Sequence, residues 1–327
     1  MARILIVGCG ELGSRHLQAV SALTGVDEIE VVEPRPGALQ KGKERVQQVS
    51  DRNGAIEYRW LNSLSEATRG GDLCVVATQA DVRCQIVREI VEKLNYSRFL
   101  IEKLVAQSID DYEVLSEFVG RSGIDVWVNC KTRAHESHKR VKQHLDPGEP
   151  IMLTALGGNQ GLANNGIHAA DLFAFYDNAN QINTDRSGVD FQLHTSRKRK
   201  GVYDLSGTLM GRSEKGSQLF LSFTSDENVP NYFSVFSSRY RAIVDDMTRT
   251  FYESTLDSEW QWSSIPIEEN MLVSSLTRRF VRDILQQNTC ELPTLTQCYP
   301  AHKFILEELQ PHFKRLLNLS DNRCPIT

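Results

Sequence analysis

The chain has 327 residues, about twice the length of a typical domain, so two domains are expected. Hydrophobic residues make up 40% and charged residues 24% of the chain, which is typical of a water-soluble folded protein. No apolar run is long enough to cross a membrane, and the N-terminus enters a strand at once, which leaves no room for a signal peptide. We therefore expect a cytoplasmic protein with no membrane partner.

The charge and the cysteines argue against two further kinds of site. A net charge of −5 argues against a nucleic-acid partner, since binding a phosphate backbone needs clustered positive charge. The one basic run, residues 197–200, is expected to be a solvated loop, with contact to an anionic substrate as the alternative. The seven cysteines are odd in number and contain no CxxC pair, so we expect reduced thiols and no metal site.

Strands and helices alternate over about the first 145 residues. Runs of branched aliphatic residues predict buried strands at residues 3–7, 28–32, 56–60, 73–77, 99–101 and 125–129. Helices are predicted to begin near Leu12, Pro36, Asp81, Ser108 and Ala134. This α/β alternation predicts a doubly wound parallel sheet of the Rossmann type, with its ligand at the carboxyl ends of the strands.

The pattern changes at residues 146–150, so we place the domain boundary between residues 147 and 148. Beyond it, strands are predicted at residues 151–156, 189–194, 201–210, 218–224, 231–236 and 240–245, and helices at residues 166–176, 268–287 and 295–317. Alternating polarity indicates a second α/β domain with a mostly antiparallel open sheet, and the final helices could pack back on the first domain. An exposed face of this sheet predicts a homodimer or homotetramer.

The turn after the first strand carries the clearest chemical signal. Gly8, Gly10 and Gly13 have the spacing of a dinucleotide-binding turn: the first allows the tight turn, the second admits a pyrophosphate, and the third lets the helix pack near the strand. The pyrophosphate would bind free N–H groups at the start of that helix. Glu33 ends the second strand, 20 residues after Gly13, where it can accept hydrogen bonds from an adenosine ribose. The alternative is a domain without nucleotide, in which Glu33 is merely solvated.

The expected nucleotide is NAD, because the Glu33 carboxylate repels the 2′-phosphate of NADP. Arg35 could accommodate that phosphate, so NADP is the alternative. Residues just after the strand ends complete the predicted cofactor site, which consists of Gly8, Gly10, Glu11, Leu12, Gly13, Glu33, Arg35, Thr78, Gln79 and Glu102.

Two side chains are candidates for the proton chemistry that accompanies hydride transfer. Lys103 directly follows a buried strand, where an ammonium can orient a substrate oxygen; the alternative is a lysine that pairs with Glu102. His168 stands where a polar loop enters a helix, and an imidazole there can act as a base near neutral pH; the alternative is a structural histidine. Asp171 lies three residues further along the same helical face and could orient the ring.

Several segments resemble one family of nicotinamide enzymes. They are the glycine turn at residues 8–16, the Glu102-Lys103 pair, the segment Gly166-Ile167-His168-Ala169-Ala170-Asp171-Leu172, and the ending formed by Phe280-Val281-Arg282-Asp283-Ile284-Leu285, Leu292-Pro293-Thr294 and a long helix. Together they resemble the glucose-fructose oxidoreductase, inositol dehydrogenase and MocA (Gfo/Idh/MocA) family, and the match covers nearly the whole chain.

This resemblance implies an NAD(P)-dependent oxidoreductase that acts on CH–OH groups of a sugar, cyclitol or sugar acid, with nucleotide sugars included. It implies that the second domain binds substrate and forms oligomer contacts. It makes Lys103 a catalytic and substrate-orienting residue and His168 the catalytic histidine. The further expected substrate-binding residues are Arg133, Asn164 and Asp171.

The chain departs from the family pattern at four positions. Leu104 replaces the proline that usually follows the lysine, and Asn164 replaces the aspartate that usually stands four residues before the histidine. Arg83 and Gln79 replace a histidine and a proline after the fourth strand. An asparagine can form hydrogen bonds but cannot take a proton. Three alternatives follow: Lys103 and His168 suffice for the proton relay, the substrate class is unusual, or the activity is weak.

Arg83, Lys131 and Arg133 are extra cations near predicted strand ends. Each alone is interpreted as a surface ion pair. Gathered around one cleft, the three would suit a carboxylate or a phosphate, as on a sugar acid or a nucleotide sugar.

Two other functions stay open at this point. An imine or biliverdin-type reductase delivers hydride to a C=N bond or a conjugated carbon, and Asn164 is then no handicap. A non-catalytic dinucleotide-binding regulatory protein would keep the fold without the activity, and Asn164 and Leu104 would then be substitutions that accompanied the loss of catalysis.

Overall fold

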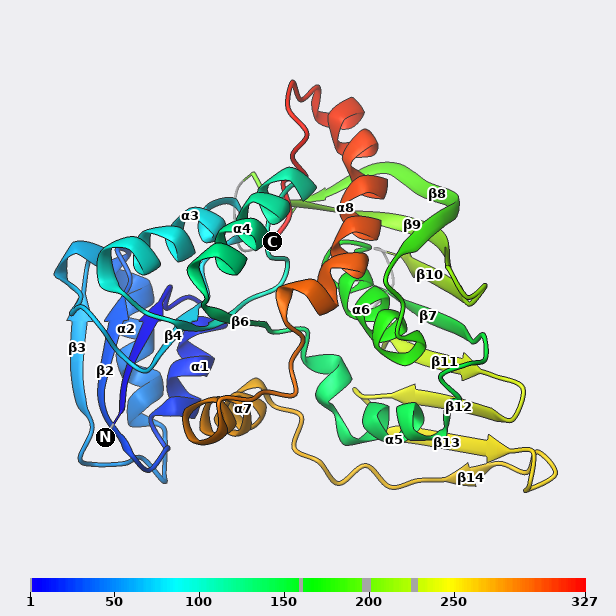
Figure 1. The fold of residues 1–327 in the computed structure, drawn as a ribbon, viewed down its shortest axis with the longest axis horizontal. Helices are drawn as coiled ribbons and strands as arrows, with labels where there is room; N and C mark the ends of the chain where they lie inside the picture. Colours follow the sequence, from blue (N-terminus) through cyan, green and yellow to red (C-terminus); the bar gives the residue numbers. More distant parts are fainter. Residues whose placement is uncertain (1, 159–160, 196–200, 225–228) are drawn as a thin grey trace. The chain divides into compact units, whose positions relative to one another are not determined.

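The structure is a computed structural model that describes residues 2–158, 161–195, 201–224 and 229–327 (Figure 1). The basic run at residues 197–200 lies outside the described residues. The chain forms two compact units. Unit 1 consists of residues 1–106, 111–129 and 270–295, and unit 2 consists of residues 107–110, 130–269 and 296–327.

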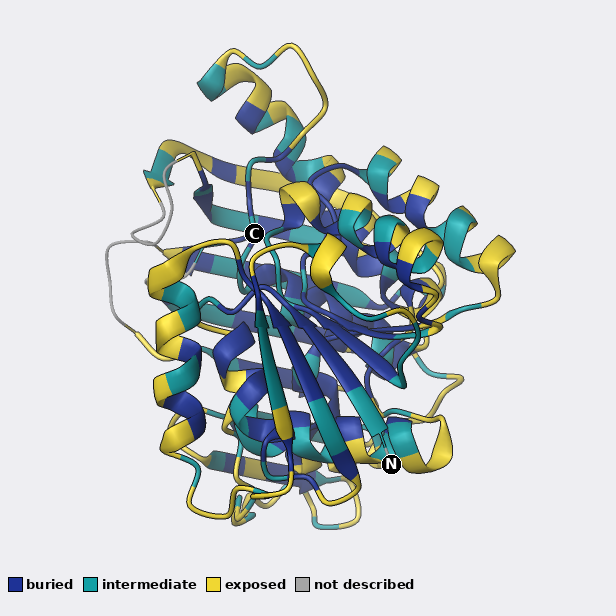
Figure 2. Cartoon of the chain, turned by 90° about the vertical axis from the view of Figure 1, so that its left-hand side faces the viewer, coloured by how far each residue is buried: buried dark blue, intermediate teal, exposed yellow. Residues whose placement is uncertain are grey.

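Unit 1 is built on a six-stranded parallel sheet. Its strands are β1 (Ala2–Val7), β2 (Val26–Val32), β3 (Glu57–Leu61), β4 (Leu73–Val76), β5 (Arg98–Ile101) and β6 (Asp125–Val128), in the order β3-β2-β1-β4-β5-β6. The branched aliphatic residues of the central strands are buried, and Figure 2 shows these strands dark blue along most of their length. The strand order confirms the predicted Rossmann sheet, and it reverses between β1 and β4, where such sheets bind their ligands.

Helices cover both faces of this sheet. Helix α1 (Gly13–Val20) packs with α2 (Pro36–Gln47) and with α7 (Val273–Gln287). Helix α3 (Ala80–Glu89), which continues as the π-helical turn η2 (Ile90–Leu94), and α4 (Ile109–Ser122) lie on the other face (Figure 1). A single 3-10 turn, η1 (Leu64–Glu66), follows β3 and begins with a capping box made by Ser63 and Glu66.

Unit 2 is built on an eight-stranded sheet in the order β14-β13-β12-β11-β7-β10-β9-β8. Its strands are β7 (Met152–Gly158), β8 (Ile182–Thr195), β9 (Tyr203–Ser213), β10 (Gln218–Thr224), β11 (Tyr232–Phe236), β12 (Tyr240–Asp245), β13 (Thr250–Thr255) and β14 (Ser263–Ser264). Neighbouring strands are antiparallel except β7 and β10, which confirms the predicted mostly antiparallel sheet. Strands β13 and β14 were not predicted. Strand β8 begins at Ile182, before the predicted residues 189–194. Most of these added residues are exposed and polar, so their sequence shows no alternation that would have marked them as a strand.

Helices cover one face of the second sheet. The elements are η3 (Lys131–Ala134), α5 (Glu136–His144), α6 (Gly166–Asp177) and α8 (Leu295–Leu317). Helix α6 packs on β7 and β10, and α5 packs on β12. Phe304 of α8 lies so close to Gly211 of β9 that a Cβ there would come within 2.9 Å of its ring. No helix in the described parts of the chain is long and apolar enough to cross a membrane.

The predicted boundary at residues 147 and 148 falls inside unit 2, because the chain leaves unit 1 directly after β6 and α5 packs on the second sheet. The chain returns to unit 1 for α7, which lies against α1. Of the two final helices, α7 therefore belongs to unit 1, whereas α8 belongs to unit 2 from Thr296 onward.

Candidate functional site

The glycine turn of unit 1 has the geometry that a dinucleotide requires. Gly8 has a φ of +89°, and a Cβ there would lie 2.9 Å from the Ala77 carbonyl oxygen. A Cβ on Gly13 would lie 1.8 Å from the carbonyl oxygen of Gly8, so only glycine lets α1 start this close to β1. At Gly10 the nearest atom to a Cβ is Nη2 of Arg35 at 3.5 Å, so the backbone is open to a ligand. The backbone N–H groups of Ser14 and Arg15 already donate to the carbonyl oxygens of Gly10 and Leu12, so a pyrophosphate would meet the positive end of α1 through the turn that precedes it.

Glu33 lies at the end of β2, where its carboxylate joins the turn to Arg35. Its Oε2 accepts a hydrogen bond from the backbone N–H of Cys9 at 2.9 Å, and its Oε1 accepts from Nε of Arg35 at 2.8 Å. Burial alone would raise the pKa of Glu33, but Arg35 and the backbone N–H groups outweigh it and lower the pKa. The carboxylate is therefore ionised near neutral pH, and the exposed Arg35 guanidinium lies between it and the open face of Gly10.

Glu11 projects from the same turn, and its charge is neutralised by helix α2. Its carboxylate pairs with Lys41 and with the buried Arg45, and these hydrogen bonds, that of Lys41 first, lower the pKa of Glu11 to about 2. Arg45 also binds the backbone carbonyl of Glu11 and the hydroxyl of Ser14. The side chain of Glu11 is thereby engaged by α2, which reduces the repulsion that it would exert on a pyrophosphate.

The loop after β4 presents polar atoms that a nucleotide could satisfy. Thr78 Oγ1 and Gln79 Oε1 are buried, and neither has a hydrogen-bond partner among the described residues. Leaving such atoms unpaired costs about 1–3 kcal/mol each, so a polar ligand is favoured there. Together with the glycine turn and Glu33, these atoms fit a nicotinamide dinucleotide.

Arg83 holds the loops after β4 and β5 together. Its guanidinium is buried and donates hydrogen bonds to the backbone carbonyls of Thr78 and Leu104. Burial lowers the pKa of Arg83 to about 10, so it is still charged at neutral pH. Arg83 is therefore neither a surface ion pair nor a cation open to substrate, and both interpretations of it are wrong because its donors bind backbone carbonyls.

Glu102 anchors the end of β5 directly before Lys103. Its buried Oε1 accepts hydrogen bonds from His16 Nε2 at 2.8 Å and from Asn129 Nδ2 at 2.6 Å, and His16 Nδ1 lies 2.8 Å from Thr277 Oγ1. Burial alone would raise the pKa of Glu102, but the histidine and the amide outweigh it and lower the pKa. This network joins β5, β6, α1 and α7, and it fixes the backbone that carries the half-buried Lys103.

In unit 2, a buried carboxylate organises the loop before His168. Asp204 of β9 accepts hydrogen bonds from the backbone N–H groups of Ala163 at 2.9 Å and Asn164 at 3.1 Å, and from Asn164 Nδ2 at 2.7 Å. A Cβ on Gly161 would lie 2.0 Å from Cγ of Asp204, so glycine permits this approach. The loop enters α6, whose first turn carries the half-buried His168.

Two predicted substrate-binding residues bind one another. Arg133 donates from Nε to Asp171 Oδ2 at 2.8 Å and from Nη2 to Asp171 Oδ1 at 2.6 Å, and both side chains are buried. The guanidinium also lies 5.1 Å from the ring centroid of Phe175. Burial opposes the charge of Arg133, but Asp171 outweighs it and raises the pKa of the guanidinium. The pair ties η3 to α6, and a role for either residue at the substrate stays a prediction.

Comparison with known proteins gives a fold and no sequence relative. No protein-family model and no curated protein matches the chain. Among solved structures, a Gfo/Idh/MocA family oxidoreductase from Vibrio cholerae has a TM-score of 0.70 at 16% identity over 98% of this chain and 100% of that chain. UDP-N-acetylglucosamine 3-dehydrogenase from Acidithiobacillus ferrooxidans has a TM-score of 0.72 at 14% identity, covering 94% and 96% of the two chains.

A third structure is an oxidoreductase from Agrobacterium radiobacter in complex with NAD⁺, L-tartaric acid and magnesium, with a TM-score of 0.71 at 14% identity over 93% of this chain and 94% of that chain. The chain has the fold of a Gfo/Idh/MocA family oxidoreductase. The predicted resemblance is thus confirmed at the level of the fold, over nearly the full length of both chains.

Within this Gfo/Idh/MocA fold, unit 1 brings together most of the predicted cofactor residues. Gly8, Gly10, Gly13, Glu33 and Arg35 lie around one turn. Sequence reasoning missed His16, Arg45, Asn129 and Asp204, which hold these segments in place. Each acts through a partner distant in sequence, and only His16, inside the glycine-turn segment, stands in a motif.

Proposed function

We propose that the protein is an NAD-dependent oxidoreductase that transfers hydride between nicotinamide and a secondary alcohol, or its ketone, of a sugar-like substrate. The observation that carries this proposal is the open backbone at Gly10, between the β1–β4 switch point and the ionised Glu33. The fold supports it, since structures of this fold include an oxidoreductase in complex with NAD⁺. NADP is the alternative, because Arg35 could turn from Glu33 to a 2′-phosphate.

When bound, nicotinamide supplies or accepts the hydride. The residues that would hold the dinucleotide are those of the glycine turn for the pyrophosphate, Glu33 for the adenosine ribose, and Thr78 and Gln79 for the polar groups nearer the nicotinamide. Glu102 is engaged by His16 and Asn129, so its role is to position the following lysine rather than to bind a ligand directly.

Lys103 and His168 are proposed to divide the proton chemistry. The ammonium of Lys103 would orient and polarise the reacting oxygen, and the imidazole of His168 would take its proton in oxidation and return it in reduction. Asn164 cannot carry the proton, and its amide is bound by Asp204, so it fits a positioning role in the loop before His168. An alcohol oxidation then needs no further acid or base from the chain.

The substrate class is proposed to be a sugar, a cyclitol or a sugar acid, with nucleotide sugars included. One structure with this fold is a dehydrogenase of UDP-N-acetylglucosamine, and another is in complex with L-tartaric acid, a hydroxy acid. Both molecules present secondary hydroxyl groups beside an anionic group.

The test is turnover with a panel of polyols, sugar acids and nucleotide sugars, following NADH at 340 nm with NAD⁺ in excess. We expect at least one substrate to reduce NAD⁺, and Lys103→Met and His168→Gln each to lower kcat by about 10²–10⁴-fold. Both variants should bind NAD⁺ as the wild type does. Turnover of imines alone would support an imine reductase, and nucleotide binding without turnover of any alcohol, ketone or imine would support a regulatory protein.

The oligomer is proposed to form through the open face of the second sheet. Met152 of β7 pairs with Phe236 of β11, and the two residues are 42% and 41% exposed. Ile243 of β12 pairs with the exposed Tyr252 of β13. Light scattering should find a dimer or tetramer, and the double variant Met152→Lys, Phe236→Lys should be a monomer. A monomeric wild type at micromolar concentration would exclude this interface.

A further inference from the structure

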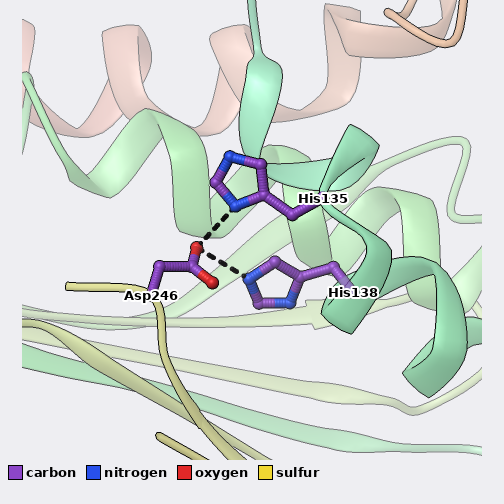
Figure 3. Close-up of side chains that lie close together, drawn as sticks. All are labelled: His135, His138 and Asp246. Atoms are coloured by element: carbon purple, nitrogen blue, oxygen red, sulfur yellow. Dashed lines mark hydrogen bonds and ion pairs between the residues drawn. The ribbon is translucent and has the colours of Figure 1, made fainter. Parts of the chain in front are cut away.

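Unit 2 contains a second group of chemically active side chains, apart from the residues proposed for catalysis. His135, His138 and Asp246 each offer one ligand atom, and the three atoms lie within 4.8 Å of one another. Both imidazoles point at the same carboxylate oxygen (Figure 3): His135 Nδ1 is 2.8 Å and His138 Nε2 is 3.2 Å from Asp246 Oδ2. The histidine side chains are 2% and 0% exposed, and that of Asp246 is 17% exposed, so the cluster is buried with one edge open to solvent.

Local structure brings the three residues together. His135 is the residue that joins η3 to α5, and His138 follows three residues later on the first turn of that helix, so both rings share one face. Asp246 stands in the turn between β12 and β13, and α5 packs on β12. The turn is fixed by the neighbouring Asp245, whose Oδ1 accepts hydrogen bonds from two backbone N–H groups at 2.9 Å and 3.0 Å.

The rings are held in place before any ligand arrives. His138 Nδ1 lies 2.6 Å from the hydroxyl of Tyr176 on α6, and Phe233 of β11 packs edge-on against the ring, with centroids 5.2 Å apart. The two imidazoles are stacked with their planes 25° apart. A partner on the distal ring nitrogen is what orients a metal-binding histidine, and Tyr176 supplies it for His138.

The geometry points to a binding site for one divalent transition-metal ion, Zn²⁺ in the first place, held by His135 Nδ1, His138 Nε2 and a carboxylate oxygen of Asp246. Ligand atoms of a tetrahedral zinc site lie about 3.3 Å apart, given metal–ligand distances near 2.0–2.1 Å. The two distances to Oδ2, 2.8 Å and 3.2 Å, come within about half an ångström of this spacing. All three atoms lie within 4.8 Å of one another, so a metal ion would need a small withdrawal of the carboxylate and a closer approach of the two imidazole nitrogens. Two nitrogen donors favour zinc, cobalt or nickel over magnesium or calcium, and water would take the fourth position.

Lys131 opposes the metal-bound form. Its Nζ lies 3.5 Å from Nε2 of His135, and an ammonium favours the tautomer in which that nitrogen accepts and Nδ1 carries the proton. Metal binding at Nδ1 moves the proton to Nε2, so the lysine must turn toward solvent. Lys131 therefore weakens the site, and its removal should have the opposite effect from removal of a ligand.

Bound metal would join α5 to the turn between β12 and β13 and so stabilise unit 2. The proposal departs from the expectation of no metal site, which was drawn from the cysteines, because the donors of this cluster are imidazoles and a carboxylate that come together only in the folded sheet domain. The proposal stands whether or not the protein is an oxidoreductase, since none of the three residues has a role in the proposed hydride transfer.

The test uses the full chain, freed of metal with a chelator and then titrated with Zn²⁺ and with Co²⁺ by calorimetry and visible absorption. We expect one equivalent of metal to bind, with a rise in the unfolding temperature on saturation. Asp246→Asn and His138→Gln should weaken binding by about 100-fold or more and lose that rise. His144→Gln, which alters an exposed histidine on the same helix, is the control and should bind as the wild type does.

The Lys131→Met variant gives the matching gain-of-affinity experiment, because it leaves all three ligands in place. It should bind Zn²⁺ more tightly than the wild type, and it keeps the test informative if a ligand variant does not fold. The site is excluded if neither the wild type nor Lys131→Met binds one equivalent of metal, or if His144→Gln removes the binding that Asp246→Asn retains.

Discussion

Asp204 of β9 binds Asn164 twice, accepting one hydrogen bond from its backbone N–H at 3.1 Å and one from its side-chain amide at 2.7 Å. The asparagine stands where the family pattern has an aspartate, and the structure places a carboxylate from another strand against it. The loop before His168 is therefore fixed by Asp204 instead of being left without a carboxylate.

The first prediction concerns this carboxylate. In the wild type, four N–H donors, from Ala163, Asn164 (two) and Leu205, point at the Asp204 carboxylate. Asp204→Asn places an amide N–H₂ group, itself a donor, against some of them, and this repulsion should displace the loop. We expect kcat to fall by about 10–100-fold, with the NAD⁺ dissociation constant unchanged because the cofactor residues are in unit 1. Asp185→Asn, which removes an exposed pair with Arg212, is the control. Equal kcat values for the wild type, Asp204→Asn and Asp185→Asn would show that the loop needs no carboxylate.

The second prediction concerns the glycine turn. A methyl group at residue 13 would lie 1.8 Å from the Gly8 carbonyl oxygen, so Gly13→Ala must push α1 away from β1. NAD⁺ binding should weaken by at least about tenfold, and the unfolding temperature should fall. Gly37→Ala is the matched control, since a Cβ in that first turn of α2 has no atom within 4 Å. Similar NAD⁺ affinities for the two variants would argue against a pyrophosphate at this turn.

The third prediction is a pH dependence of stability. The pKa of Glu33 is lower in the folded protein than the usual value of about 4.3, so the unfolded chain binds a proton that the native state does not. The contribution of Glu33 to the free energy of unfolding is present above about pH 4, and it is lost as the pH falls toward the folded-state pKa of this carboxyl group. Glu33→Gln should therefore lower the free energy of unfolding at pH 7 and flatten its decline in acid. Glu57→Gln, an exposed substitution on β3, should do neither, and an unchanged acid decline in Glu33→Gln would contradict the assignment.

The fourth prediction concerns Arg83. Arg83→Met leaves two buried carbonyl oxygens, those of Thr78 and Leu104, without their donors. The free energy of unfolding, measured with urea, should fall by about 2–4 kcal/mol. Arg88→Met, on the exposed side of the same helix, should change it by less than about 1 kcal/mol. A loss no larger than that of the control would mean that water replaces the guanidinium.

Much of unit 1 could be predicted from its sequence. Its strands are short runs of buried aliphatic residues and its glycines stand at a fixed spacing, so strand, turn and helix follow from local patterns. Unit 2 was harder because edge strands carry weaker patterns: β13 alternates incompletely, and β14 has only two residues, both exposed.

The side chains that position the site were not predictable for a different reason. His16 meets Glu102, and Asp204 meets Asn164, across dozens of residues of chain, and no local pattern encodes such a pairing. Arg133 and Asp171 are both predicted as substrate-binding residues, and the fold brings them together as a buried ion pair. Sequence spacing singles out polar residues as candidates, but it does not show which of them form hydrogen bonds with one another.

Calorimetric titration of the full chain with NAD⁺ measures whether unit 1 binds a nicotinamide dinucleotide. We expect one NAD⁺ per chain with a dissociation constant of about 1–100 μM, which is −8 to −5.5 kcal/mol. Gly13→Ala should abolish or weaken this binding, and Gly37→Ala should leave it unchanged. Absence of binding of both NAD⁺ and NADP⁺ at about 1 mM, to a wild-type protein that is folded, would contradict the proposed function.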